Sequence, residues 1–316
     1  MANTITLFSA GKLVYEDFSA LADTTVITTE NTNFTNVVYD PAHTTDFIKT
    51  TILGIPCVDN PDNSQYGYDY GLGITSDRSS DKEIFFQVYS HRTTSNRQVM
   101  GGGNTAIRAG LILHVFDYIN NYVTWDVLGH AQYNNYITPR KTMTGLWTML
   151  QTYNSHSEGS EQYIYDVSND IVVAETKNTY IPISDSFGTG SLIWKVAADT
   201  RSGSDVYFAY ICITKSKWVT INGVINNMVV QLLDDSDVVV RTTKADSTSI
   251  KIDMMKLPMG VKSYKFKIYG TDGSVLLTTT AQTIFGGDTW TYAGDTATPS
   301  ANAKKVISNN NIAGGF

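Results

Sequence analysis

The side chains that most often carry catalysis are present, but their spacing matches no catalytic motif. None of the five histidines lies two to five residues from another, which is the spacing of local zinc-binding motifs. They are His43, His91, His114, His130 and His156. No Gly-x-Ser-x-Gly sequence places a nucleophilic serine on a sharp turn. Glu158 and Glu161 are the close glutamate pair, and their Ser/Gly-rich surroundings predict a loop rather than a catalytic strand. We therefore expect a protein that is not an enzyme, with no catalytic residue, no metal site and no cofactor.

Two acidic runs and a glycine-rich stretch carry groups that bind ions in other proteins. Asp59–Asn63 and Asp234–Asp237 offer the oxygen ligands that Ca²⁺ takes from loops, but neither continues to the glycine and glutamate of an EF-hand. Asp and Asn are also typical of hairpin turns, where they bond to the local backbone. Gly101–Asn104 lacks the Lys-Ser/Thr of a phosphate-binding loop. We expect turns at all three places, with Ca²⁺ as the alternative at the acidic runs.

Tyrosine has the pattern best suited to recognition. In two stretches it alternates with Asn, Gly or Asp, and Tyr rings suit both protein interfaces and stacking against sugars. The alternative is ordinary aromatic packing at a strand edge. The candidate ligand or partner surface consists of Tyr66, Tyr68, Tyr70, Tyr133 and Tyr136.

The composition favours β-strands as the elements that position these side chains. The 316 residues are 42% hydrophobic, enough for two domains with sizeable cores. Aromatic residues are frequent, with 19 Tyr, 12 Phe and 5 Trp, and β-branched residues are abundant. In IFFQVYSH, strict alternation places Phe85, Gln87 and Tyr89 on one face of a strand and Phe86 and Val88 on the other. The predicted fold class is all-β.

Charge and hydropathy exclude several classes of function. A net charge of −7 disfavours nucleic-acid binding, which needs a basic face. No apolar run approaches the ~18–20 residues of a membrane span. The start of the chain lacks the basic and then apolar pattern of a signal peptide, so we expect folding in a cytoplasm. Cys57 and Cys212 are too few for a disulfide framework; two reduced, buried thiols are favoured over one disulfide.

Strand and turn signals divide the chain into five parts. Residues 1–45 are weakly patterned and form an N-terminal arm or a first set of strands. Short β-branched and aromatic segments separated by turn residues predict a jelly-roll-like β-sandwich over 46–216. A linker over 217–227 leads to a smaller sandwich over 228–292, and residues 293–316 form a C-terminal extended arm.

The 228–292 block resembles an Ig-like module. The resemblance rests on the turn Leu257–Gly260, the strand Tyr264-x-Phe266-x-Ile268 and the Asp-Gly hairpin signal that follows it. It spans about 65 residues, near the lower limit for that fold, and lacks the Cys-Trp-Cys core of antibody domains. It implies a sandwich of two antiparallel sheets.

The C-terminal residues are too polar to bury a core of their own. Their candidate anchors on a neighbouring molecule are Val306, Ile307 and Phe316. Extended arms add backbone pairing when they lie on a neighbour, and symmetric homo-oligomers multiply such weak contacts.

In style, the chain resembles virion structural proteins of tailed bacteriophages. The likeness lies in its Thr/Asn/Gly/Tyr-rich composition, its few cysteines, its polar ends and its pairing of a jelly-roll-like with an Ig-like block. In that family, such proteins are capsid decoration, head-fibre, collar or tail appendage parts. The resemblance implies a homo-oligomer assembled in the host bacterial cytoplasm and located in the virion. Its partners would be copies of itself and other virion proteins. The alternative is a carbohydrate-binding module that attaches to a host-surface glycan through exposed tyrosines.

Overall fold

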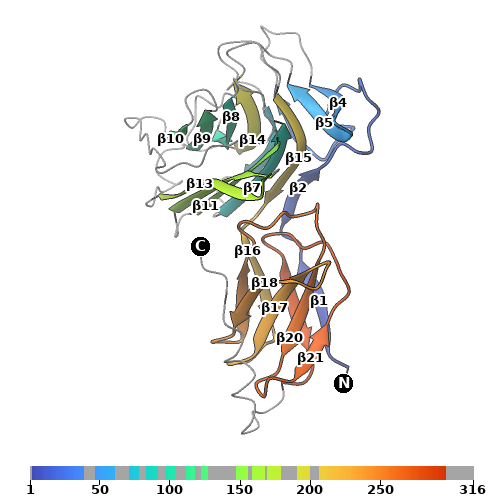
Figure 1. Ribbon diagram of the computed structural model, residues 1–316, viewed down its shortest axis with the longest axis vertical. Coiled ribbons are helices and arrows are strands. Elements are labelled where there is room, and N and C mark those ends of the chain that lie inside the picture. The colour runs from blue at the N-terminus through green and yellow to red at the C-terminus, as the bar shows by residue number, and fades with distance from the viewer. Residues whose placement is uncertain are drawn as a thin grey trace. The chain divides into compact units, whose positions relative to one another are not determined.

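Strands make up the regular structure of the chain in the computed structural model (Figure 1). The described residues are 2–38, 47–60, 71–77, 83–91, 97–103, 112–117, 122–126, 147–155, 159–167, 169–178, 191–199 and 206–296. They contain 22 strands in four sheets and no helix. Accordingly, none of these residues belongs to a helix that could span a membrane. The predicted all-β class is confirmed.

The strands form two compact units, one of which is inserted into the other. The described residues up to Lys12 and from Ser216 onward form one unit, which we call the terminal sandwich. Leu13–Lys215 form the second unit, the inserted sandwich. The polypeptide therefore enters and leaves the inserted sandwich between the first and second strands of the terminal sandwich. Insertion of this kind is tolerated because domain ends lie at the surface and often close together.

This division corrects two predicted boundaries. Residues 1–45 do not form one arm, because β1 (Thr4–Ser9) pairs in the terminal sandwich while β2 (Lys12–Glu16) pairs with a strand of the inserted one. The predicted linker 217–227 contains β16 (Trp218–Asn222), an inner strand of its sheet. Alternation explains β16, since the side chains of Val219 and Ile221 are both 0% exposed.

Two four-stranded sheets build the terminal sandwich. One has the order β1-β22-β16-β19 and the other β18-β17-β20-β21. The strands not yet bounded are β17 (Val229–Asp234), β18 (Val239–Lys244), β19 (Ser249–Asp253), β20 (Tyr264–Tyr269), β21 (Val275–Thr278) and β22 (Thr289–Ala293). Along β20, buried and half-buried residues alternate as the sequence predicts. Phe266 meets Trp290 of the opposite sheet edge-to-face, with ring centroids 5.4 Å apart, so the core lies between the sheets.

The strands of this sandwich are mostly antiparallel. β16 and β22 run parallel, whereas the other pairs of these two sheets are antiparallel. Both hairpins, β17–β18 and β20–β21, stay within one sheet. The unit therefore has the two-sheet sandwich architecture that the resemblance to an Ig-like module implies.

Polar side chains fasten both ends of β1 to the terminal sandwich. The buried Asp288 carboxylate accepts hydrogen bonds from the N–H of Gly11 (2.8 Å) and of Phe285 (2.9 Å). At the other end, the Asn3 amide donates to the Leu276 carbonyl (2.9 Å) and accepts from the Asp295 N–H (2.7 Å). The N-terminal strand is thus an integral part of a sandwich whose other strands lie more than 200 residues further along the chain.

The inserted sandwich packs a large sheet against a six-stranded one. The large sheet has the order β13-β12-β11-β7-β15-β5-β4 with β2 beside β15, and the smaller β10-β9-β8-β14-β6-β3. The strands are β3 (Asn36–Val38), β4 (Ile48–Ile52), β5 (Ile55–Asn60), β6 (Gly71–Asp77), β7 (Glu83–His91), β8 (Arg97–Gly103), β9 (Ile112–Asp117), β10 (Tyr122–Asp126), β11 (Trp147–Ser155), β12 (Gly159–Asp166), β13 (Ile171–Asn178), β14 (Ser191–Asp199) and β15 (Val206–Thr214).

One face of β7 supplies the centre of this core. Ile84, Phe86 and Val88 pack in a buried cluster with Leu72 and Ile74 of β6, which belongs to the opposite sheet. The remaining side chains of β7 therefore lie on the other face of the large sheet. The prediction from IFFQVYSH, that two sets of side chains alternate between faces, is confirmed.

Candidate functional site

Most residues that the sequence singled out lie outside the described residues. This holds for both tyrosine stretches and for the arm anchors, namely Tyr66, Tyr68, Tyr70, Tyr133, Tyr136, Val306, Ile307 and Phe316. Their roles stay predictions. Glu158 also falls outside, but Glu161 lies on β12 opposite Tyr153 and is 8% exposed. The predicted loop is therefore wrong at Glu161, because β12 begins at Gly159 within the Ser/Gly-rich segment.

The acidic run Asp234–Asp237 is a tight turn whose oxygens are already engaged. An Asp234 side-chain oxygen accepts from the N–H of Ser236 (3.0 Å) and of Val238 (2.9 Å). The Lys265 ammonium donates to the Asp237 carboxylate at 2.7 Å. A lysine thus supplies the positive charge that a cation would bring. Among the described residues, no group of three or more His, Cys, Asp or Glu side chains could hold a metal ion.

Aromatic side chains gather on the large sheet of the inserted sandwich, on the face away from its core. Strand register brings them together, because Trp147 and Tyr207 both lie opposite His91, and Tyr210 lies opposite Tyr89. We call these five residues the aromatic cluster. It draws on three strands, and its members come from parts of the chain up to about 120 residues apart. The alternation in the sequence of β7 predicted the face on which Tyr89 lies. No local pattern predicted that residues of β11 and β15 would lie beside it.

The rings of the aromatic cluster contact one another directly. Tyr89 and Trp147 are stacked, with centroids 4.9 Å apart and planes at 22°. His91 meets Trp147 edge-on at 5.1 Å and Tyr207 at 5.9 Å. The Tyr210 hydroxyl donates to the Met149 sulfur at 3.2 Å. Half-buried rings of Tyr89, His91 and Tyr207 lie beside the buried Trp147.

Burial shapes the protonation of the aromatic cluster. It lowers the pKa of His91 and raises that of Tyr89, since the charged form of each is disfavoured. The His91 Nδ1 atom is buried and has no hydrogen-bond partner among the described residues. In the next row of the sheet, Gln87 and Gln151 lie opposite each other and are both 0% exposed. Within the cluster, burial therefore favours the neutral forms of His91 and Tyr89.

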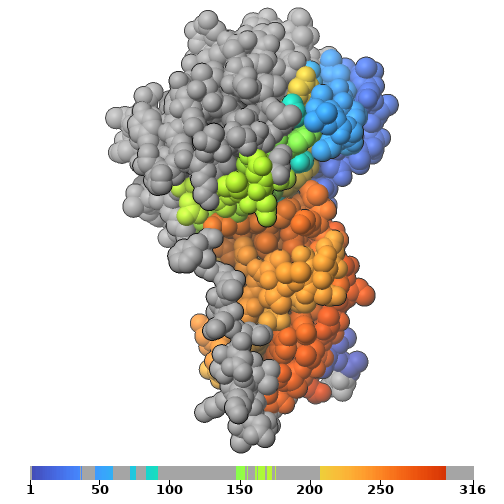
Figure 2. Space-filling view, in the orientation of Figure 1, coloured from blue at the N-terminus to red at the C-terminus, as the bar shows by residue number. Residues whose placement is uncertain are grey.

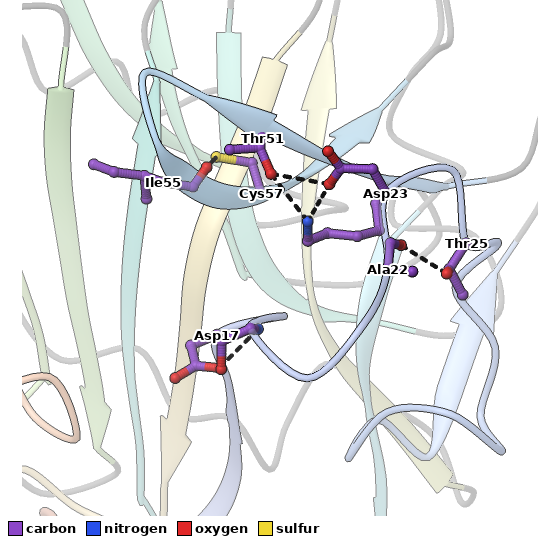
Figure 3. Close-up of polar contacts among 9 residues, drawn as sticks. Asp17, Ala22, Asp23, Thr25, Thr51, Ile55 and Cys57 are labelled. Atoms are coloured by element: carbon purple, nitrogen blue, oxygen red, sulfur yellow. Dashed lines mark hydrogen bonds and ion pairs between the residues drawn. The ribbon is translucent and has the colours of Figure 1, made fainter.

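The thiol of Cys57 lies beside the aromatic cluster, where it packs with Trp147. Its Sγ–H group donates a hydrogen bond to the Ile55 carbonyl at 3.2 Å, and Figure 3 shows this contact and the hydrogen bond from Thr51 to Asp23. Burial raises the pKa of the Cys57 thiol to about 11, from an ordinary value of 9.0. Cys212 is also buried, which agrees with the prediction of two buried thiols.

Cys57 will resist alkylation in the folded protein. At pH 8, raising the pKa from 9.0 to about 11 lowers the thiolate fraction, and with it the iodoacetamide rate, roughly 100-fold relative to the unfolded chain. Peptide mapping by mass spectrometry separates Cys57 from Cys212. The neutral thiol also stabilises the fold fully below pH 9, and this contribution is lost as the pH rises toward about 11. Equal rates in folded and denatured protein would contradict the burial of this thiol.

The second candidate site is the outer edge of β1 in the terminal sandwich. Within the described residues, β1 pairs with β22 and with no strand on its other side. Its sequence Thr4–Ser9 holds no charged residue, and Leu7 and Phe8 are 47% and 78% exposed. In Figure 2, the N-terminal strand lies at the surface beside the orange terminal sandwich. An edge of this kind presents unpaired backbone groups and apolar side chains to a partner.

Comparisons with known proteins do not place the chain in a family. No family model matches it, and no curated protein is similar enough in sequence to match. Among solved structures, a protein of unknown function from Shewanella oneidensis MR-1 aligns at 11% identity over 64% of this chain and 84% of its own, with a TM-score of 0.37. Arcelin-5, a lectin-like defence protein from Phaseolus vulgaris, aligns at 8% over 68% and 98%, with a TM-score of 0.36. A Trypanosoma rangeli sialidase aligns at 11% over 66% of this chain but 31% of its own, also at 0.36. Similarity at this level carries no functional argument.

Proposed function

We propose that the chain is a non-enzymatic structural component of a virus particle, which assembles through surfaces of its β-sandwiches. The observation that carries the proposal is the uncharged outer edge of β1, where Leu7 and Phe8 are exposed. Soluble monomers usually protect such edges with charges, proline or covering segments. A protein that assembles gains from leaving one edge open.

The virion part of the proposal rests on the resemblance in composition and in the pairing of two sandwich blocks. Its partners are copies of itself and other virion proteins, and its location is a phage particle assembled in the bacterial cytoplasm. The nested organisation supports such a role. Hydrogen bonds hold β1 in the terminal sandwich at both of its ends, and two chain connections join the inserted sandwich to that unit.

Sedimentation velocity of the intact chain tests the proposal. We expect reversible association over a roughly hundredfold range of concentration, since a protein built to assemble on a particle keeps weak self-contacts in solution. A strictly monomeric chain at every concentration would contradict the proposal. Co-purification with phage particles from the producing cells would support the virion part directly.

A carbohydrate-binding role is the second candidate, and the aromatic cluster favours it. Half-buried His91 and Tyr207 stand beside the stacked Tyr89–Trp147 pair, and rings of this kind can stack on a sugar. If a glycan array identifies a ligand, Tyr207→Ala should weaken binding about tenfold, which corresponds to one ring contact of about 1.4 kcal/mol. Tyr269→Ala, which changes the terminal sandwich, is the matched control. Equal loss in both variants would contradict a site at the aromatic cluster.

A further inference from the structure

One side of the terminal sandwich is bounded by two edge strands, one from each sheet. β1 ends the first sheet and β21 ends the second. The Asn3 amide, which donates to the Leu276 carbonyl, joins the beginning of β1 to β21. On the opposite side, edge strands β18 and β19 lie against each other, and the Arg241 guanidinium donates to the Asp253 carbonyl at 2.9 Å. We call the side with β1 and β21 the open side and the side with β18 and β19 the closed side.

The two sides also differ in charge. Neither Thr4–Ser9 nor Val275–Thr278 contains a charged residue. The strands of the closed side carry Arg241, Lys244 and Lys251, as well as Asp253. On the open side, Leu7, Phe8 and Val275 are 47%, 78% and 52% exposed. The two strands of the open side are thus uncharged, on a chain whose net charge is −7, and the exposed Asp295 lies beside Asn3 at the beginning of β1.

We propose that the open side binds a second copy of this chain, with the two β1 strands paired antiparallel across a two-fold axis. The inference rests on the proposed function and names its contact surface. Antiparallel pairing of one strand with itself presents the same patch on both molecules, as a closed dimer requires. It would join two four-stranded sheets into one continuous sheet through main-chain hydrogen bonds.

The positions of the exposed side chains fit a second copy of the chain as the partner. In a two-fold antiparallel pair, the end of one β1 lies beside the beginning of the other. Val275 lies near the beginning of β1, since Asn3 bonds to the adjacent Leu276. Phe8 of one copy would therefore face Val275 of the second copy and bury both. Two molecules of like net charge also repel each other least where neither carries charge.

The small size of the β1 contact surface determines how tightly we expect two copies to bind. The shift in register between Leu7 and Ser9 makes Phe8 a bulge and limits regular pairing to Thr4–Leu7. A ladder this short buries less than the ~1,200 Å² of a standard interface, so we expect a dissociation constant on the order of micromolar. On a particle, many copies held together would make such a contact effective.

Single charges on the open side test the inference in the intact chain. Phe8→Lys should weaken dimerisation at least about tenfold in sedimentation velocity, because it removes the apolar contact and places a charge on the edge. Val238→Lys is the matched control, since Val238 is 57% exposed in the turn that begins β18, on the closed side. It should leave the dissociation constant unchanged. If Phe8→Lys melts at a lower temperature than the parent protein, Thr6→Lys serves as the second test. It also places a charge at an exposed position on β1.

The outcomes separate this inference from the proposed function. If the parent chain and Val238→Lys associate while the β1 variants do not, the result supports a dimer through β1. If all variants associate as the parent does, the β1 surface is wrong while assembly through another surface stands. If the parent chain is monomeric throughout, both the surface and the proposed function are overturned.

Discussion

Gly11→Ala will destabilise the terminal sandwich by about 3 kcal/mol or more. A Cβ atom at Gly11 would lie 2.1 Å from the Gly287 carbonyl carbon and 2.2 Å from the Gly286 oxygen. These are backbone atoms, so no side chain can rotate away to make room. Relief would require Gly11 to move away from the Asp288 carboxylate, which would break a buried 2.8 Å hydrogen bond that holds the end of β1. Unfolding by denaturant, followed through tryptophan fluorescence, measures the loss.

Gly54→Ala is the matched control for this prediction. Gly54 occupies the hairpin between β4 and β5 with φ near +81°, and nothing lies within 4 Å of its added Cβ. Gly54→Ala should therefore lower the free energy of unfolding only by the ~1–2 kcal/mol that a left-handed backbone conformation costs a residue with a side chain. A cost at Gly11 no larger than that at Gly54 would contradict the close approach of the two chain segments.

Phe266→Ala will destabilise the terminal sandwich by about 3–5 kcal/mol, the usual cost of removing a fully buried phenylalanine. Its side chain is 0% exposed and packs edge-to-face on Trp290 of the opposite sheet. The truncation leaves a cavity where the two sheets meet and also removes the ring contact. Chemical denaturation gives the free energy of unfolding.

Lys267→Ala on the same strand provides the comparison. Lys267 points to the other face of β20, which is half-buried, so its truncation should change stability by no more than about 0.5 kcal/mol. Similar losses at Phe266 and Lys267 would mean that the two sheets do not share this core.

Local sequence patterns predicted the elements well where their alternation was strong. The alternation in Tyr264–Tyr269 is visible in the sequence because lysines alternate with apolar residues up to Ile268, and the structure shows the corresponding strand. The same holds for one face of β7. The strand β16 was missed because a five-residue segment with three hydrophobic residues, Trp218, Val219 and Ile221, gives a weak signal next to turn residues.

Partners that lie far apart in the chain could not be predicted from local patterns. Thr4 pairs with Ala293, and nothing in either segment specifies the other. The aromatic cluster has the same origin, since the register of β7, β11 and β15 decides that Trp147 meets His91. Register depends on the whole buried face of a sheet rather than on a single strand. The sequence therefore predicted the fold class and several strands, but neither the nested organisation nor the cluster.

Hydrogen exchange of the β1 amides tests most directly the central claim that both parts of the chain outside the inserted sandwich build one sandwich. Amides of β1 that bond to β22 should exchange as slowly as those of β22 itself, because both need the terminal sandwich to unfold. Asp288→Ala should speed exchange in β1 more than in β20 by releasing Gly11. Rapid exchange throughout Thr4–Ser9 in a protein whose β22 stays protected would contradict the claim. It would leave the N-terminal strand as a loose arm.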